Sequence, residues 1–387
     1  MNKRSVFLIS LALFCATSAH GKDWPVDLST TQGLEQTCTQ FRGAASQSVS
    51  RDADKVAFAI CSGIDMARDA LGWYRINAPK MNANGPGAVK EVRAKLEGYL
   101  VTIETTRKLL ETIKTTKPLL TIQPGQWELD MDGDGTISPF EKHFFWIPKR
   151  GADINRQLPS FNSMEEYEQA MFTRPTIKVD QSDVYWAIAY CHFAEATLNL
   201  LLSYELVDAQ QFKIQLADPE RVKSVAYPSL LGGIAYSRKL RESLQKETSD
   251  ENEWIPNARQ KNTSFPLVMD EQTFATWGEL LGHMDKLFRG KTLMGGSVTV
   301  QNAMVRDLSM GLCKPGEGVD VRDLFQNPIV HPTERSEWQT KCKKATPALP
   351  LTGLAAMIDA SIKRNSAGGP ENLSGEWMIL RHFYWVN

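Results

Sequence analysis

The sequence predicts a mostly all-α protein built from several helices. Apolar residues recur at spacings of three and four along extended stretches, as they do on one face of a helix. Segments rich in Pro, Gly and Asn separate these stretches. Strand-like segments are few, and the clearest, 176–179 and 296–301, are short. The chain has 387 residues, of which 42% are hydrophobic and 23% are charged, which is typical of a globular protein.

Two helices are predicted most clearly. In the segment 88–116, apolar residues from Val92 to Ile113 recur in alternating steps of four and three, and Pro118 ends the helix. The segment 182–206 is apolar nearly all round, so we expect a central helix with Ser182 as its N-cap. Further helices are predicted at 35–47, 52–74, 219–247, 270–288, 297–312 and 351–363, and linkers at 77–87, 149–162 and 246–266.

The first residues predict a secretory signal peptide. Lys3 and Arg4 precede the apolar run 6–16, which is too short to span a bilayer comfortably, and small residues follow it. Cleavage is expected after Ala19 or Gly21. Because no later run of about 18 apolar residues occurs, we expect a mature chain that is periplasmic or secreted and has no transmembrane segment.

The cysteines predict two disulfides and one free thiol. The mature chain holds five of the six cysteines, so an oxidising compartment leaves at least one without an intrachain partner. Cys38 and Cys61 flank a polar segment that would join two antiparallel helices, which favours a bridge between them. Cys313 and Cys342 flank a loop-rich stretch that a second bridge would fix. Cys191 lies in the apolar helix and is expected as a buried thiol, although five cysteines permit other pairings.

The acidic stretch "DMDGDGTISPFE" offers oxygen ligands at the spacing of a calcium loop. Such a loop uses side chains at positions 1, 3 and 5, a backbone carbonyl at 7, an oxygen at 9 and a bidentate carboxylate at 12. A glycine at position 6, here Gly135, allows the sharp turn because glycine takes positive φ without strain. The six expected ligands, in that order, are Asp130, Asp132, Asp134, Thr136, Ser138 and Glu141.

This segment resembles the EF-hand calcium-loop family over residues 130–141 only. The resemblance implies a bound Ca²⁺ ion, whereas Mg²⁺ resists so large a set of protein ligands. The alternative is an acidic turn without an ion, because residues 138–141 would also form a capping box with proline at the first helical position. That alternative leaves the three closely spaced aspartates unexplained, since their charges repel unless a cation lies among them.

The neighbours of the loop favour a structural site over a sensor. Pro124 and Pro148 leave room only for short flanking helices, and no partner loop occurs elsewhere in the sequence. Such sites bind calcium weakly, with dissociation constants of about 10⁻⁴ to 10⁻³ M. Ile137, at the position through which such loops pair, needs another backbone segment, and 176–179 is the candidate. The aromatic residues expected to anchor the segment are Trp127, Phe140, Phe144, Phe145 and Trp146.

Other sites have weaker signals. Three pairs could each offer two metal ligands: His192 with Glu195, Glu279 with His283, and His331 with Glu334. No H-E-x-x-H, C-x-x-C, P-loop or G-x-S-x-G motif accompanies them. Lys+Arg (44) and Asp+Glu (45) balance, which argues against a nucleic-acid partner. The aromatic-rich segment 376–387 is expected to dock on the core, with a partner-binding surface as the alternative.

Together these features predict an exported calcium-binding protein, a non-enzymatic binding or scaffold protein rather than an enzyme. One alternative is an enzyme of unrecognised type with a supporting calcium ion, and another is a helical partner of an envelope transport system. Polar groups of perturbed pKa in a deep cleft would favour the enzyme, and a shallow apolar groove would favour the partner. The expected regions are a signal peptide at 1–21, an N-terminal helical region at 22–123, an EF-hand-like segment at 124–150, a central helical region at 151–250 and a C-terminal helical region at 266–387.

Overall fold

The computed structural model describes residues 25–42, 49–78, 81–115, 118–149, 162–208, 211, 213–265, 269–295 and 313–353. Within these residues the protein is mostly helical, and its strands form only short antiparallel pairs, which confirms the predicted fold class. The predicted signal peptide, the elements at 296–301 and 297–312, nearly all of the helix at 351–363 and the segment 376–387 lie outside the described residues.

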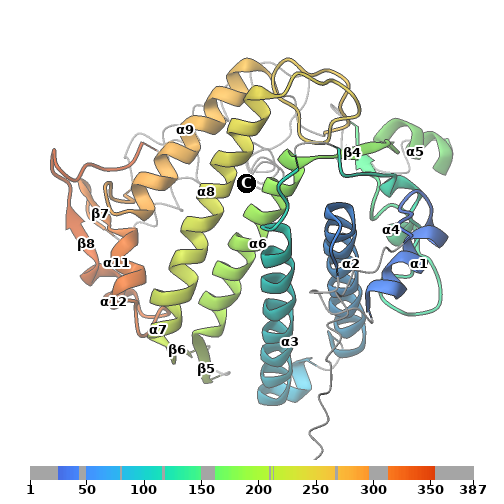
Figure 1. Cartoon of the computed structure of the whole chain (residues 1–387). Helices are drawn as coiled ribbons and strands as arrows, with labels where there is room; N and C mark the ends of the chain where they lie inside the picture. The colour runs from blue at the N-terminus through green and yellow to red at the C-terminus, as the bar shows by residue number, and fades with distance from the viewer. Residues whose placement is uncertain are drawn as a thin grey trace, which may run out of the picture.

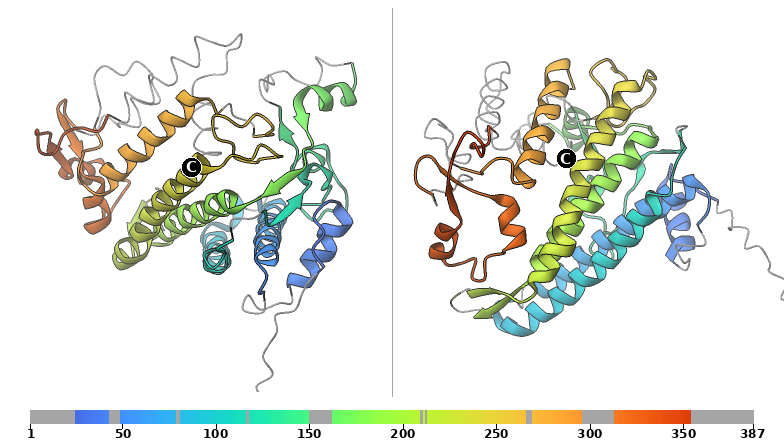
Figure 2. Two further views of the ribbon diagram at one scale, coloured as in Figure 1. Left: turned by 45° about the horizontal axis from the view of Figure 1, so that its top comes forward. Right: turned by 60° about the vertical axis from the view of Figure 1, so that its left-hand side comes forward.

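The longer helices stand side by side in the order α2, α3, α6, α8, α9 (Figure 1). Their bounds are α2 Asp52–Asn77, α3 Met81–Leu110, α6 Gln181–Leu202, α8 Tyr227–Lys246 and α9 Glu271–Phe288. Helix α1, Thr31–Arg42, packs on the outer side of α2. Figure 2 shows the N-terminal and C-terminal elements at opposite ends of this row of helices.

Helix α6 lies in the middle of the row, between α3 and α8, as its all-round apolar composition predicts. Val184, Ile188 and Ala189 are fully buried there. The predicted N-cap was wrong: Asp180, not Ser182, caps the helix and forms a reciprocal capping box with Asp183. The sequence offers several capping side chains in a row at this point, so the choice among them depends on where the preceding strand ends.

Helix α3 begins at Met81, inside the segment 77–87 that the sequence predicts as a linker. It ends at Leu110, several residues before Pro118. Glycine and proline content is a weak prior that tertiary packing overrides, and α3 packs against both α2 and α6.

The remaining elements are short and connect or flank the long helices. They are η3 Pro124–Gln126, α4 Pro139–Lys142, α5 Met164–Met171, α7 Pro219–Arg221, the π-helical turn η5 Val222–Ala226, α11 Val321–Gln326 and α12 Arg335–Thr340. The antiparallel strand pairs are β1 Leu120–Ile122 with β4 Ile177–Val179, β2 Ile147–Pro148 with β3 Phe172–Thr173, β5 Tyr204–Asp208 with β6 Lys213–Leu216, and β7 Glu317–Val319 with β8 Cys342–Lys344.

Both predicted disulfides are confirmed. Cys38 of α1 bridges Cys61 of α2 with a Cα–Cα distance of 5.2 Å, and Cys313 bridges Cys342 of β8 with a Cα–Cα distance of 5.5 Å. Cys191 on α6 carries a free thiol, and burial raises the pKa of that thiol to about 12. Disulfides of this kind are typical of an oxidising, extracytoplasmic compartment. In the described part of the chain, no helix combines the length and the apolar character needed to cross a membrane.

Candidate calcium site

The approach to the acidic loop is anchored in a buried cluster beside α1 and α2. Trp127, Leu129 and Met131 are at most 3% exposed and belong to the same apolar cluster as Leu34 and Phe41 of α1. The indole Nε1–H of Trp127 donates to the carbonyl of residue 28 at 3.0 Å. The loop therefore leaves the protein core from a fixed point.

The turn itself is built around Asp130, as the loop pattern predicts. Its carboxylate accepts hydrogen bonds from the N–H groups of Gly133 at 2.7 Å, Asp134 at 3.2 Å and Gly135 at 2.9 Å. Gly133 has φ +72° and Gly135 has φ +89°, a backbone region that residues with a Cβ rarely adopt. The sharp turn predicted at Gly135 is therefore present, and it folds the backbone around the first carboxylate.

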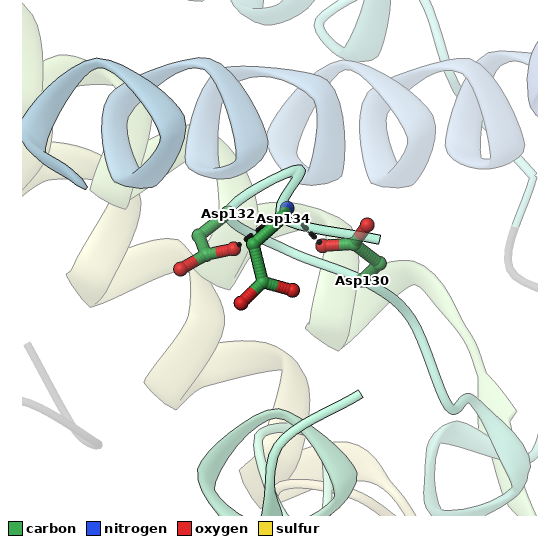
Figure 3. Close-up of side chains that lie close together, drawn as sticks. All are labelled: Asp130, Asp132 and Asp134. Atoms are coloured by element: carbon green, nitrogen blue, oxygen red, sulfur yellow. Dashed lines mark hydrogen bonds between the residues drawn. The ribbon is translucent and has the colours of Figure 1, made fainter. Parts of the chain in front are cut away.

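Three of the six predicted ligands converge. One carboxylate oxygen each of Asp130, Asp132 and Asp134 can be chosen so that all lie within 4.8 Å of one another. Figure 3 shows Asp130 and Asp132 on either side of Asp134, whose N–H donates to both carboxylates. Oxygens bound to one calcium ion at about 2.3–2.6 Å lie at most about 5 Å apart. The spacing of this triad therefore fits a single calcium ion.

Helix α2 holds the loop from behind. Arg75, in its last turn, donates from Nε to the Asp132 carbonyl and from Nη2 to the Gly133 carbonyl, both at 3.1 Å. The Arg75 guanidinium also lies 3.6 Å from the Asp132 carboxylate and offsets part of its charge. A Cβ on Gly72 would lie 3.1 Å from the Asp132 carbonyl oxygen, so the glycine allows this close approach.

Glu141, the predicted bidentate ligand, does not join the triad in this structure. It is 4% exposed, and its Oε1 accepts from the N–H groups of Met131 at 2.8 Å and Asp132 at 3.1 Å. Its Oε2 accepts from the N–H and hydroxyl of Ser138, which in turn caps α4. Burial opposes the charge, but the hydrogen bonds from Ser138, then Met131 and Asp132, outweigh it and lower the pKa of the carboxyl. Glu141 ties the end of the loop to its beginning.

Thr136 and Ser138, the two remaining predicted ligands, lie in the sequence between Asp134 and Glu141. The hydroxyl and the N–H of Thr136 donate to the Asp134 carboxylate, at 2.7 and 2.8 Å, and lower its pKa. Thr136 is exposed and Ser138 is half-buried. The capping box at residues 138–141 is present. Both hypotheses, a calcium loop and an acidic turn before a helix, predict it, so it does not distinguish them.

The segment after the loop differs from expectation in two respects. Trp146 is buried, and the partly buried Phe145 packs against the apolar cluster that contains Trp127. In contrast, Phe140 is 65% exposed and Phe144 is 38% exposed. The predicted anchoring by Phe140 is therefore wrong, because α4 ends after one turn and leaves that ring on the surface. Phe144 is partly exposed but packs against Phe145, with ring centroids 4.9 Å apart. Ile137 is 48% exposed, and the pairing predicted for it is also wrong.

The segment 176–179, predicted to pair with the backbone of Ile137, pairs with strand β1 instead. Within the described residues, β4 pairs with β1 in the register Leu120 with Val179 and Ile122 with Ile177. Both strands enter the buried cluster between α2, α3 and α6, and that burial decides the pairing.

The weaker metal candidates are dispersed. His192 Nε2 lies 3.4 Å from Glu111, whereas Glu195 is bound by Arg107. Burial, followed by the charge of Arg107, lowers the pKa of His192 to about 4, so this imidazole stays neutral. Neither the pair Glu279 and His283 nor the pair His331 and Glu334 belongs to a carboxylate or imidazole cluster among the described residues.

Sequence reasoning missed a second carboxylate cluster. Oxygens of Asp180, Glu247 and Glu253 lie within 4.8 Å of one another. Burial, then a hydrogen bond with Asp180, raises the pKa of Glu247 to about 9, and burial likewise raises the pKa of Glu253. Glu247 therefore keeps its proton at neutral pH. Asp180 precedes α6, Glu247 follows α8, and Glu253 lies in the loop after it. In the sequence, the only indication of a carboxylate cluster was the acidic run 250–253.

Comparison of the chain with protein-family models, with curated proteins and with solved structures gave no match. The resemblance to the EF-hand calcium loop therefore concerns only the spacing of residues 130–141. What this segment can bind follows from the oxygen atoms that it presents.

Proposed function

We propose that this chain is an exported, non-enzymatic calcium-binding protein in which the ion stabilises the connection between α3 and α6. The observation that carries the proposal is the convergence of the Asp130, Asp132 and Asp134 carboxylates within 4.8 Å. Three like charges at this distance repel one another, and a divalent cation turns the repulsion into attraction. The Arg75 guanidinium supplies only one positive charge against three carboxylates, and the one of these with which it forms an ion pair is Asp132, at 3.6 Å.

The surroundings favour a structural ion over a regulatory one. The loop is entered from the single 3₁₀ turn η3 and left through the one-turn helix α4. A calcium switch needs two long helices that enter and leave the loop and whose angle can change, whereas η3 and α4 each have only one turn. Calcium binding here would order a short connection without opening a buried surface.

The direct test is calorimetric titration of the full chain with CaCl₂, together with thermal melts in calcium and in chelator. Ion binding to the folded state alone raises the melting temperature by mass action. We expect heat of binding and a higher melting temperature for the wild type, and neither effect for Asp130→Ala. An affinity in the range of about 10⁻⁴ to 10⁻³ M is expected for such a site.

Asp270→Ala is the matched control. Asp270 also accepts an N–H hydrogen bond, from Thr273 at the start of α9, but it lies outside the loop. Its loss should lower the melting temperature equally in calcium and in chelator, because removing this N-cap, worth about 1 kcal/mol, does not alter the loop. A wild-type chain that shows neither heat nor a shift in melting temperature would refute calcium binding.

Export is part of the proposal and has its own test. The basic start, the apolar run and the small residues within 1–21 support a signal peptide, and the two disulfides fit an oxidising destination. We expect the chain recovered from the periplasm or the medium of the expressing cell to begin near residue 20 or 22. N-terminal sequencing of the fractionated protein checks this, and an intact N-terminus on a cytoplasmic protein would contradict it.

A further inference from the structure

An apolar pocket of about 580 Å³ opens between the helices and the segment that follows the loop. Its walls come from α2, α3, α6, β1, β4 and residues 144–147. Small-molecule sites commonly measure about 300–1,000 Å³ and lie between secondary elements that are already fixed. The size and position of this pocket are therefore those of a ligand site.

The lining of the pocket is almost entirely hydrocarbon. Ile103, Val184 and Trp186 are representative of its walls, and no Lys, Arg or His is among the described residues that line it. Asp183 is the one carboxylic acid in the lining, and burial raises the pKa of its carboxyl well above the ordinary value. An anionic ligand would lose its hydration here and find no cation, so the pocket disfavours anions.

Gly63 of α2 lines the pocket and is itself exposed to solvent. It lies in the interior of the 26-residue helix α2. A Cβ placed on Gly63 would have no atom within 4 Å, so nothing fills the space that a side chain would take. A glycine within a helix costs about 0.5–1 kcal/mol relative to alanine, so local helix stability does not favour glycine at this position.

Two hydrogen-bonding groups of the lining have no protein partner. They are the Thr106 hydroxyl and the Trp146 indole N–H, on residues that are 7% and 5% exposed. Buried donors without a partner cost about 1–3 kcal/mol each. Their presence in the wall suits a ligand that carries one acceptor group on an otherwise apolar body.

We propose that this pocket binds an uncharged, largely apolar small molecule with a single hydrogen-bond-accepting group, such as a long-chain alcohol. The apolar walls supply the affinity, and the partnerless donors of Thr106 and Trp146 orient the polar end of the ligand. No residue of the acidic loop 130–141 lines the pocket, and binding there does not require an ion in the loop.

The test uses the neutral fluorescent probe N-phenyl-1-naphthylamine with the full chain, in chelator. We expect saturable binding that 1-dodecanol displaces and that dodecanoate displaces at least about tenfold less well. Gly63→Leu, which fills the open space, should weaken probe binding by at least about tenfold. Dodecylamine is included because a cation could pair with Asp183.

Gly98→Leu is the matched control. Gly98 also lies within a long helix, α3, its Cβ position also has no atom within 4 Å, and it does not line the pocket. We expect Gly98→Leu to bind the probe like the wild type, and circular dichroism to show both variants folded.

Four results would overturn the proposal. The first is no saturable binding to the wild type, and the second is equal loss of binding in both variants. The third is displacement best achieved by dodecylamine or dodecanoate, which would mean a charged ligand. The fourth is binding that appears only after removal of residues 354–387, which would assign the pocket to the chain's own C-terminal residues.

Discussion

At the scale of single residues, Glu247 links the stability of the protein to pH. Its pKa is raised to about 9 in the folded chain, chiefly by burial, against an ordinary value of 4.5. Between these values the folded state keeps a proton that the unfolded state has lost, so the free energy of unfolding falls as pH rises from about 4.5 to about 9. We expect Glu247→Gln to reduce that fall, as measured by urea denaturation at pH 5 and pH 8.

Glu251→Gln is the control for this prediction. Glu251 is fully exposed, and its hydrogen bond with Lys178 lowers the pKa of its carboxyl. Both its folded and unfolded pKa values then lie below 5, so its removal should leave the slope between pH 5 and pH 8 unchanged. A slope that is the same in wild type and Glu247→Gln would show that the remaining cluster, not Glu247, carries the pH dependence.

The residues of the loop divide into those that the sequence predicts and those that it does not. Gly135 and the aspartate triad follow from local rules, because a tight turn needs positive φ at a fixed position and the ligands alternate along the chain. The orientation of Glu141 does not follow, because it depends on the N–H groups of Met131 and Asp132 at the other end of the loop. The hydrogen bonds from Arg75 to the loop carbonyls join segments that are distant in sequence, so the local pattern of residues could not predict them either.

At the scale of helices, a buried ion pair joins α3 to α6. Arg107 Nε donates to Glu195 Oε1 at 2.5 Å, and the Ser229 hydroxyl of α8 donates to the other oxygen at 3.3 Å. Arg107→Leu leaves the buried Glu195 carboxylate without its cation, which should cost about 3–5 kcal/mol. Because the double variant Arg107→Leu/Glu195→Leu removes both charges, it should cost less than Arg107→Leu alone. Chemical denaturation of the four proteins in this mutant cycle measures both effects.

Lys108→Leu is the neighbouring control on the same helix. Lys108 is 64% exposed and pairs with Glu104 at 3.4 Å, one turn earlier. Exposed pairs of this kind contribute about 0.3–0.5 kcal/mol, so this change should be nearly neutral. A cost for Arg107→Leu as small as that for Lys108→Leu would mean that water reaches Glu195 in solution.

The disulfide between α1 and α2 is predicted to stabilise the buried cluster from which the acidic loop 130–141 begins. It closes a separation of 23 residues, and Cys38 and Cys61 are both 2% exposed in the cluster that also contains Trp127. A bridge that closes a loop of this length contributes about 3 kcal/mol, mainly by restricting the unfolded chain. We expect Cys38→Ala/Cys61→Ala to lose about that much in urea denaturation. An unchanged midpoint would show that packing alone fixes α1 on α2.

Helix positions were predictable where periodicity is strong, and their ends were not. The segments 52–74 and 270–288 match α2 and α9 closely, because their apolar residues repeat over many turns. Helix α5 was missed, since its eight residues make only about two turns, too few for a clear apolar repeat, and lie beside a stretch rich in turn formers. The strand pairing of 176–179 was misassigned because pairing depends on what the other strand buries, which no local pattern contains.

At the scale of the whole molecule, the proposed calcium loop is followed directly by a segment that lines the apolar pocket. Residues 144–147, which line the pocket, begin three residues after Glu141. Phe145 also contacts Trp127, before the loop, with ring centroids 5.3 Å apart. An ion that orders the loop would therefore help to hold this wall in place before a ligand arrives. The loss of conformational entropy on ordering the wall would then occur when calcium binds, and it would no longer weaken ligand binding.

We therefore predict that saturating calcium strengthens binding of N-phenyl-1-naphthylamine to the wild type by about fivefold or more relative to chelator, the lower range of coupling between sites. Reciprocity requires the probe to strengthen calcium binding by the same factor, which calorimetry in the presence of the probe measures. Asp130→Ala should bind the probe in chelator like the wild type and show no response to calcium. If calcium binds the wild type but leaves probe affinity unchanged, the loop and the pocket are independent, because a shared wall that calcium ordered would have to couple them.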